Sequence, residues 1–200
     1  MLRFTIALIW LSPAIATAQC LTANSLDSGI TVEYGNGNVA YLERDESGIQ
    51  LDSYIDNGYA EEIILFRSYD GIFNAGQTVH TKNSWEALEK TSITYDFEMP
   101  DPTSLAEGDR GNGTRTLDDS VYGPRIGAFG WSVYASAPLV VGDCSYEAVR
   151  IFTHTISFRD GIFDLREVKY LPEPGIGLQV GNSGFGSGIV NAEIVSLIEN

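Results

Sequence analysis

The chain has 200 residues, of which 27 are acidic, 12 are basic and 44% are hydrophobic, with a formal net charge of −15. This is a globular composition, and it excludes a disordered, collagen-like or coiled-coil chain. The negative charge makes nucleic acids and anionic membrane surfaces poor partners, because both are polyanions. The two histidines and two cysteines are far apart in the sequence and do not form the closely spaced ligand pairs of a zinc finger or the cysteine set of an iron–sulfur site. We expect no nucleic-acid partner and no cofactor.

The first residues predict an export signal. Arg3 precedes an apolar stretch over residues 4–15, and Ala16-Thr17-Ala18 is the small-x-small pattern after which signal peptidases cut. We expect residues 1–18 to be removed, so that the mature chain begins at Gln19 in the periplasm or outside the cell. No later stretch reaches the roughly 18 apolar residues that a spanning helix needs. We therefore expect no transmembrane span in the mature chain.

The two cysteines are predicted to form a disulfide, Cys20 to Cys144. An exported chain meets an oxidising compartment, and an even number of cysteines pairs off there. Lipidation of Cys20 is the alternative, but bacterial lipoprotein signals need a small residue where Gln19 stands. A structural disulfide is the favoured interpretation.

The mature chain is predicted to be all-β. Short segments of alternating apolar and polar residues are separated by turn sequences, among them Asn36-Gly37 and Asp70-Gly71. Strands are expected near residues 30–34, 39–44, 49–55, 59–68, 93–99, 146–158, 162–170, 176–180 and 189–197. Their spacing predicts an antiparallel meander that forms an open barrel or a two-sheet sandwich, with residues 19–200 as a single domain.

Two segments depart from the strand pattern. Asn83 and Glu86 resemble a capping box ahead of good helix formers, which predicts one short helix over residues 84–90. Residues 100–124 are polar and rich in glycine and proline. Loops of such length are uncommon in compact domains and are usually functional or disordered. We expect a long loop over a binding surface there.

Catalytic patterns are not apparent in the sequence. Gly181-Asn182-Ser183-Gly184 resembles the nucleophile strip of chymotrypsin-like proteases but departs from it at the acidic position. Neither His80 nor His154 stands in the matching context, and a serine nucleophile needs a positioned base. His154 is a candidate general base, although a hydrogen-bonded strand histidine is the favoured interpretation. We lean towards a protein that is not an enzyme.

An acidic, glycine-bent stretch leaves calcium binding open. Residues 109–113, followed by Asp118 and Asp119, are rich in oxygen ligands. Arg110 and Gly111 interrupt the ligand order of an EF-hand, so a solvated acidic loop is the favoured alternative.

Apolar groups on both faces of some strands predict that something covers the second face. Residues 63–66 are continuously apolar, which is typical of a central strand. The cover is another sheet, the short helix, or an apolar ligand under the 100–124 loop. The aromatic residues expected to face such a ligand are Phe66, Phe73, Phe97, Trp131 and Phe152. A closed core without a cavity is the alternative.

The tract Tyr170-Leu171-Pro172-Glu173-Pro174-Gly175-Ile176-Gly177-Leu178 resembles exported β-rich proteins of unknown function from Gram-negative bacteria. Those proteins are similar in texture to the periplasmic lipoprotein-carrier half-barrels, in which a curved antiparallel sheet holds acyl chains. The chain lacks the prominent helices of the carriers. The resemblance implies an envelope-associated scaffold and carries over no functional residue.

The leading functional hypothesis is a non-enzymatic binding or envelope-associated protein that holds an apolar ligand or a protein partner. A glycan-acting hydrolase that uses carboxylates is the first alternative. The second is a carbohydrate-binding module in which Trp85 and Trp131 are stacking platforms.

Overall fold

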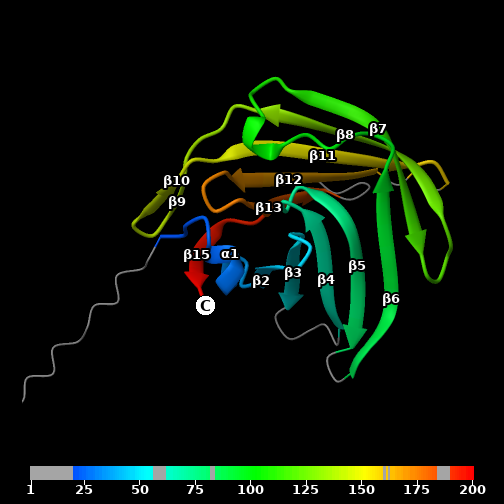
Figure 1. Ribbon diagram of the computed structural model, residues 1–200, viewed down its shortest axis with the longest axis horizontal. Helices are drawn as coiled ribbons and strands as arrows, with labels where there is room; N and C mark the ends of the chain where they lie inside the picture. Colours follow the sequence, from blue (N-terminus) through cyan, green and yellow to red (C-terminus); the bar gives the residue numbers. More distant parts are fainter. Residues whose placement is uncertain (1–19, 56–61, 82–83, 160, 162, 184–189) are drawn as a thin grey trace, which may run out of the picture.

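The computed structural model describes residues 20–55, 62–81, 84–159, 161, 163–183 and 190–200. Thirteen strands form one antiparallel sheet in the order β14-β13-β12-β11-β8-β7-β6-β5-β4-β3-β2-β1-β15, and β9 and β10 form a separate hairpin. The large sheet curves round into a nearly closed barrel (Figure 1). The all-β prediction is confirmed, and of the two forms expected the structure adopts the barrel.

The elements follow one another closely along the chain. They are α1 (Ser25–Ser28), β1 (Ile30–Tyr34), β2 (Val39–Arg44), β3 (Gln50–Ile55), β4 (Glu62–Tyr69), β5 (Phe73–Thr81), β6 (Ser84–Tyr95), η1 (Pro102–Ser104), β7 (Arg110–Asp119), β8 (Arg125–Tyr134), β9 (Leu139–Val141), β10 (Cys144–Tyr146), β11 (Val149–Ser157), β12 (Phe163–Leu171), β13 (Ile176–Ser183), β14 (Val190–Asn191) and β15 (Ile194–Glu199).

The helix predicted over residues 84–90 is wrong, because this segment is the first half of β6. Its backbone pairs with β5, with Glu89 opposite Val79 and Lys90 opposite Thr78. Helical geometry here would leave that edge of β5 without a partner. Pairing within the sheet therefore overrides local helix propensity. The α-helix of the described residues is instead the single turn α1.

The long loop expected over residues 100–124 is also wrong, because β7 occupies residues 110–119. Aromatic rings from neighbouring segments pack directly on two of its glycines. A Cβ added at Gly111 would lie 2.5 Å from the indole nitrogen of Trp131, and one at Gly113 would lie 2.6 Å from Cδ1 of Phe97. Rings from adjacent segments thus supply the apolar cover that the side chains of β7 lack.

The two edges of the sheet are joined by one C-terminal segment. Asn191 of β14 pairs with Gly181 of β13, and Leu197 of β15 pairs with Val32 of β1. Between these strands, the Ala192 N–H donates to the Val180 carbonyl at 2.8 Å. The segment therefore pairs with both ends of the sheet and limits the exposed edge.

Two apolar clusters make up the core. The first joins α1, β1 and β2 to β13, the β9–β10 hairpin and β15, and includes Ile30, Val32, Leu42, Leu139, Tyr146, Ile176, Leu178 and Leu197. The second is rich in aromatic residues and consists of Ile72, Phe73, Phe129, Trp131, Val133, Ile151, Val168 and Tyr170. The consecutive β12 residues Tyr170 and Leu171 belong to different clusters, which explains why this strand carries apolar groups on both faces.

A close contact across the barrel joins β13 to the β4–β5 turn. A Cβ added at Gly177 would lie 2.6 Å from the carbonyl carbon of Gly71 and 2.7 Å from the carbonyl oxygen of Asp70. The buried side chain of Gln50 in β3 donates to the Gly177 carbonyl at 2.9 Å and accepts from the Gly177 N–H at 3.2 Å. The Gln50 amide also donates to Asp52 at 2.7 Å. Three distant segments therefore meet at one glycine.

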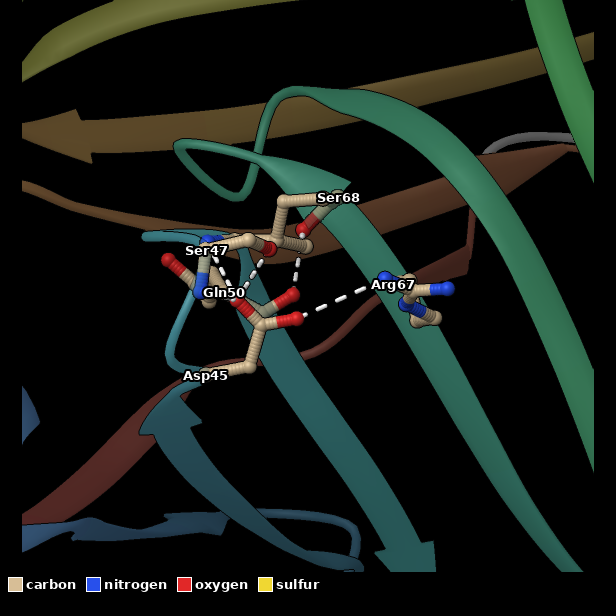
Figure 2. Close-up of polar contacts among 6 residues, drawn as sticks. Asp45, Ser47, Gln50, Arg67 and Ser68 are labelled. Carbon is tan, nitrogen blue, oxygen red and sulfur yellow. Dashed lines mark hydrogen bonds and ion pairs between the residues drawn. The ribbon is translucent and has the colours of Figure 1, made fainter.

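The β2–β3 turn is held by a carboxylate network (Figure 2). Asp45 Oδ1 accepts hydrogen bonds from the backbone N–H groups of Ser47 at 2.8 Å and Ile49 at 2.9 Å. Its other oxygen lies 3.4 Å from the Arg67 guanidinium of β4. This network fixes the start of β3, where Gln50 lies.

The disulfide between Cys20 and Cys144 is present and ties the N-terminal segment to β10. It joins residues separated by 124 positions in the sequence. Leu21, the next residue, lies in the first core, and its N–H donates to the Tyr146 hydroxyl at 3.1 Å. The bridge therefore anchors the first core.

Among the described residues, no helix is long and apolar enough to cross a membrane.

Replacing both cysteines by serine tests the contribution of the bridge. Because the disulfide restricts a long loop of the unfolded chain, we expect the free energy of unfolding to fall by about 2–4 kcal/mol. Urea denaturation measures this loss. Intact mass spectrometry of the unreduced wild type, after treatment with an alkylating reagent, counts its free thiols. Two alkylatable cysteines in the wild type would contradict the disulfide.

The buried Asp52 carboxyl predicts a pH dependence of stability. Burial raises its pKa from 3.8 to about 7, against the lowering effect of the Gln50 hydrogen bond. The folded state therefore binds this proton more tightly than the unfolded state does, so the free energy of unfolding falls as the pH rises from about 4 to about 7. Asp52→Asn keeps an oxygen acceptor for Gln50 and removes this titration. Between pH 5 and pH 8, we expect the free energy of unfolding of the variant to rise by about 2–3 kcal/mol relative to that of the wild type. Urea denaturation at each pH measures this difference.

Asp45→Asn is the matched control at an exposed turn. Hydrogen bonds from Ser47 and Ile49 lower the pKa of Asp45, so its contribution is present above the ordinary carboxyl pKa and is lost as the pH falls. The control should therefore lose stability relative to wild type at neutral pH. A difference between Asp52→Asn and wild type that does not change with pH would refute the assignment.

Candidate binding groove

A groove of about 620 Å³ opens between the β4–β5 turn and the segment that follows β6. It is lined by Tyr69, Asp70, Ile93, Thr94, Tyr95, Phe97, Met99, Pro100, Asp101 and Pro102. Its volume falls in the range of about 300–1,000 Å³ that is typical of small-molecule sites. Apolar side chains make most of the wall, and two carboxylates lie among them.

Local sequence explains how the two walls are formed. Asp70 and Gly71 are the central residues of the turn that the Ile72 N–H closes by donating to the Tyr69 carbonyl at 3.0 Å. Their φ angles of 52° and 70° are those that Asp-Gly favours. Tyr69 is 40% exposed at the end of β4. On the other wall, Asp101 caps η1 by accepting from the Thr103 N–H at 2.9 Å. Both carboxylates are therefore placed by turns of defined geometry.

The aromatic wall is held by ring packing on the second core. The Tyr95 ring lies 4.9 Å from Phe129 and 5.4 Å from Phe97, both edge-to-face. Phe97 also stacks on Phe129 at 5.8 Å between centroids. Tyr95 and Phe97 thus contact buried Phe129 on one side and border the groove on the other. A wall held in this way is preorganised for an apolar ligand.

The two groove carboxylates differ in their electrostatics. Partial burial raises the pKa of Asp70, an effect that Arg44 opposes and the charge of Asp101 reinforces. Hydrogen bonds from the Thr103 side chain and backbone lower the pKa of Asp101. The groove therefore has a negative side, where the charge of Asp101 acts on Asp70.

A polar layer lies beneath the aromatic wall. Burial raises the pKa of Tyr95 to about 12, although Arg115 acts in the opposite direction. The Tyr95 hydroxyl donates to the Asn74 carbonyl at 2.9 Å. Asp164 and Arg166 of β12 join Tyr95 and Arg115 around a cavity of about 10 Å³, room for about one water molecule. The groove therefore ends at Tyr95, above a charged interior.

Three of the five aromatic residues predicted to face a ligand meet at the second core, where the Phe73 and Trp131 ring centroids lie 6.4 Å apart and Phe97 packs against the cluster. Phe73 and Trp131 are 2% and 8% exposed in the second core, while Phe97 lines the groove. Phe66 lies on β4 with the Arg166 guanidinium 5.9 Å from its ring. Phe152 alternates with buried Ile151 and Thr153, so it lies on the other face of β11, with its ring 5.1 Å from Tyr134. The buried Trp131 is no stacking platform for a sugar, and the side chain of Trp85 lies outside the described residues.

The residues considered as catalytic or metal-binding candidates take part in packing, turns and ion pairs. His154 packs on Gly130, where an added Cβ would lie 2.4 Å from its Nε2. Ser183 is buried in β13, and Gly184 lies outside the described residues. Asp109 accepts from the Ala106 N–H at 2.8 Å, and Asp119 pairs with Arg125 at 2.7 Å. Within the described ranges, no three His, Cys, Asp or Glu side chains are grouped to hold a metal ion.

Tyr69, Asp70, Met99 and Asp101 line the groove, and no pattern in the sequence predicts them as site residues. Three of them lie in or beside turns, where hydrophobic periodicity carries no signal. The local sequence predicts the Asp70-Gly71 turn, but it does not indicate what that turn faces.

Comparison with protein-family models, with curated proteins and with solved structures found no match to this chain.

Proposed function

We propose that the protein is a non-enzymatic binding scaffold that holds a small amphipathic molecule in the groove beside Tyr69, Tyr95 and Phe97. The observation that carries this proposal is the 620 Å³ groove with its preorganised aromatic wall. Concave, mostly apolar sites with a few polar groups are the usual form of small-molecule sites. A concave groove of this size favours a small ligand over a protein partner, whose interface would be broader and flatter.

The lining defines the class of ligand. An apolar body would pack on Tyr95, Phe97 and Met99, where it displaces water from ring surfaces. A cationic or hydroxyl-bearing end would lie at Asp70 and Asp101, which attract positive charge and accept hydrogen bonds. An apolar body with an amine or hydroxyl end fits both parts.

We further propose that the protein acts in the periplasm or outside the cell. The disulfide between Cys20 and Cys144 supports this location, because such bonds persist in oxidising compartments. The predicted signal, residues 1–18, lies outside the described residues, and N-terminal sequencing of the exported protein tests it.

A neutral dye such as Nile red tests the groove without a known ligand. We expect saturable binding to the folded wild type, and Tyr69→Ala should weaken it by about five- to tenfold, because a half-exposed ring is removed from the wall. Tyr41→Ala is the matched control, since Tyr41 is 43% exposed on β2 and Tyr69 is 40% exposed. Fluorescence titration measures both affinities.

Failure of the dye to bind, or equal weakening by the two tyrosine variants, would contradict the groove proposal. Native mass spectrometry of protein purified from its own periplasm or medium then identifies the natural occupant. An apolar molecule that copurifies with the wild type and with Tyr41→Ala, but not with Tyr69→Ala, would support the groove proposal.

A glycan-acting hydrolase is the second candidate, favoured by two carboxylates on one aromatic groove. Their pKa values move in opposite directions, upward for Asp70 and downward for Asp101, as acid and nucleophile or base require. A panel of glycan substrates should then be hydrolysed by the wild type and by Asp118→Asn, an exposed control. Asp70→Asn and Asp101→Asn would each abolish turnover, whereas a pure binding protein shows no turnover in any form.

A further inference from the structure

A second cavity, separate from the groove, lies on the same face of the sheet as Phe129 and Trp131. It has a volume of about 130 Å³ and is bordered by Arg115, Arg125, Thr155, Ser157 and Asp164 among others. None of these residues lines the groove. The volume is many times the roughly 10–15 Å³ that one water molecule needs.

The strand register explains why these side chains converge. Arg115 of β7 lies opposite Gly127 of β8, and Gly127 lies opposite Ser157 of β11. Directly opposed residues project to the same face of an antiparallel sheet. Gly127 adds no side chain between Arg115 and Ser157, and the β11 backbone packs closely on it, because a Cβ there would lie 2.6 Å from the Ile156 carbonyl oxygen. Arg125 lies two residues from Gly127 and therefore projects to the same face.

Two buried polar atoms without hydrogen-bond partners belong to residues that line this cavity. They are Nε of Arg125 and Oγ of Ser157, and within the described part of the chain they are the two buried side-chain atoms in this condition. Buried polar groups in folded proteins are nearly always paired, so each exception requires an explanation. Both residues line the same cavity, and both can donate to an anion.

The remaining contacts orient Arg125. Its Nη2 pairs with Asp119 at 2.7 Å, and Asp119 also accepts from the Val121 and Tyr122 N–H groups at 2.7 and 3.0 Å. The guanidinium carbon lies 5.6 Å from the Tyr122 ring centroid. One end of the guanidinium is thereby fixed while Nε–H stays unpaired. An arginine held in this way is preorganised to bind an oxyanion.

The charge around the cavity is positive, although the whole chain has a net charge of −15. Arg115 and Arg125 line it with Asp164, and Arg166 pairs with Asp164 at 3.0 Å. The negative charge of Asp119 offsets the positive charge of Arg125, and that of Asp164 offsets that of Arg166. Arg115, which bonds to the neutral Tyr95 hydroxyl, supplies the remaining positive charge.

We propose that this cavity binds a phosphate-type oxyanion through Arg115, Arg125 Nε–H and the Ser157 hydroxyl. The three donor residues come from β7, β8 and β11 and line one cavity, and Asp164 repels an anion only in part because Arg166 neutralises it. The ligand is either free phosphate or the phosphate end of a monoester. This inference does not depend on the proposed groove function.

Isothermal titration of the full chain with inorganic phosphate tests the site, with sodium chloride at matched ionic strength as the salt control. Ser157→Ala should keep the fold and weaken phosphate binding by at least about fivefold, because it removes one hydrogen-bond donor. Ser157→Asp places a carboxylate in the site and should abolish binding. Arg67→Gln, an arginine paired with Asp45 outside the cavity, should bind as the wild type does.

The source of the anion is decided by a parallel titration with glycerol 3-phosphate. Tighter binding of the monoester indicates an ester ligand, and binding of inorganic phosphate alone indicates the free anion. The proposal is overturned if phosphate does not bind at millimolar concentration, if chloride matches its effect, or if Ser157→Ala and Ser157→Asp bind as the wild type does. Circular dichroism of each variant confirms that it is folded.

Discussion

The backbone contact between Gly71 and Gly177 is the constraint on which the shape of the molecule depends. A long antiparallel meander of this kind could remain an open curved sheet, since pairing of neighbouring strands does not require the two ends to meet. Here the β4–β5 turn touches β13 at a distance that excludes a Cβ on either glycine. The Gln50 amide pairs with Gly177 as a neighbouring strand would. The sheet is therefore drawn in on itself at one point as well as joined along its edges.

The groove follows directly from this contact, and the arginine-lined cavity from the strand register beside it. Because the β4–β5 turn is held against β13, Tyr69 and Asp70 face the end of β6 and form one wall of the groove. On β7, β8 and β11, the register places Arg115, Gly127 and Ser157 side by side at the cavity. The chain carries 12 basic residues in all, and three of the arginines meet around Asp164. A strongly acidic protein thus has a local region that is suited to an anion.

The parts of the fold that the sequence predicted are those with strict alternation. Ile30 and Val32 alternate with polar residues between turn signals, and β1 has the predicted bounds. The first half of β6 was missed because its residues favour helix and only pairing with β5 makes them a strand. Residues 110–119 were missed because Gly111 and Gly113 carry no apolar pattern, and the rings that cover them come from elsewhere. Local sequence contains none of that information.

The candidate sites were less predictable than the fold. The groove joins residues near position 70 to residues near position 100, and the oxyanion cavity joins four strands through their register. Of the aromatic residues chosen from the sequence, Phe73, Trp131 and Phe97 meet at the second core. Phe97 borders the groove, whereas Phe152 lies on the other face of β11. The disulfide was predictable because two cysteines within one chain allow a single pairing.

Replacement of Gly177 by alanine measures the cross-barrel contact most directly. Gly35→Ala is the control, because an added Cβ there meets its nearest atom at 3.5 Å, an ordinary contact. Neither glycine has a positive φ angle that would penalise alanine. We expect Gly177→Ala to lose at least about 2 kcal/mol of unfolding free energy in urea denaturation, and Gly35→Ala to stay within about 0.5 kcal/mol of wild type. Equal stability of Gly177→Ala and wild type would contradict the account.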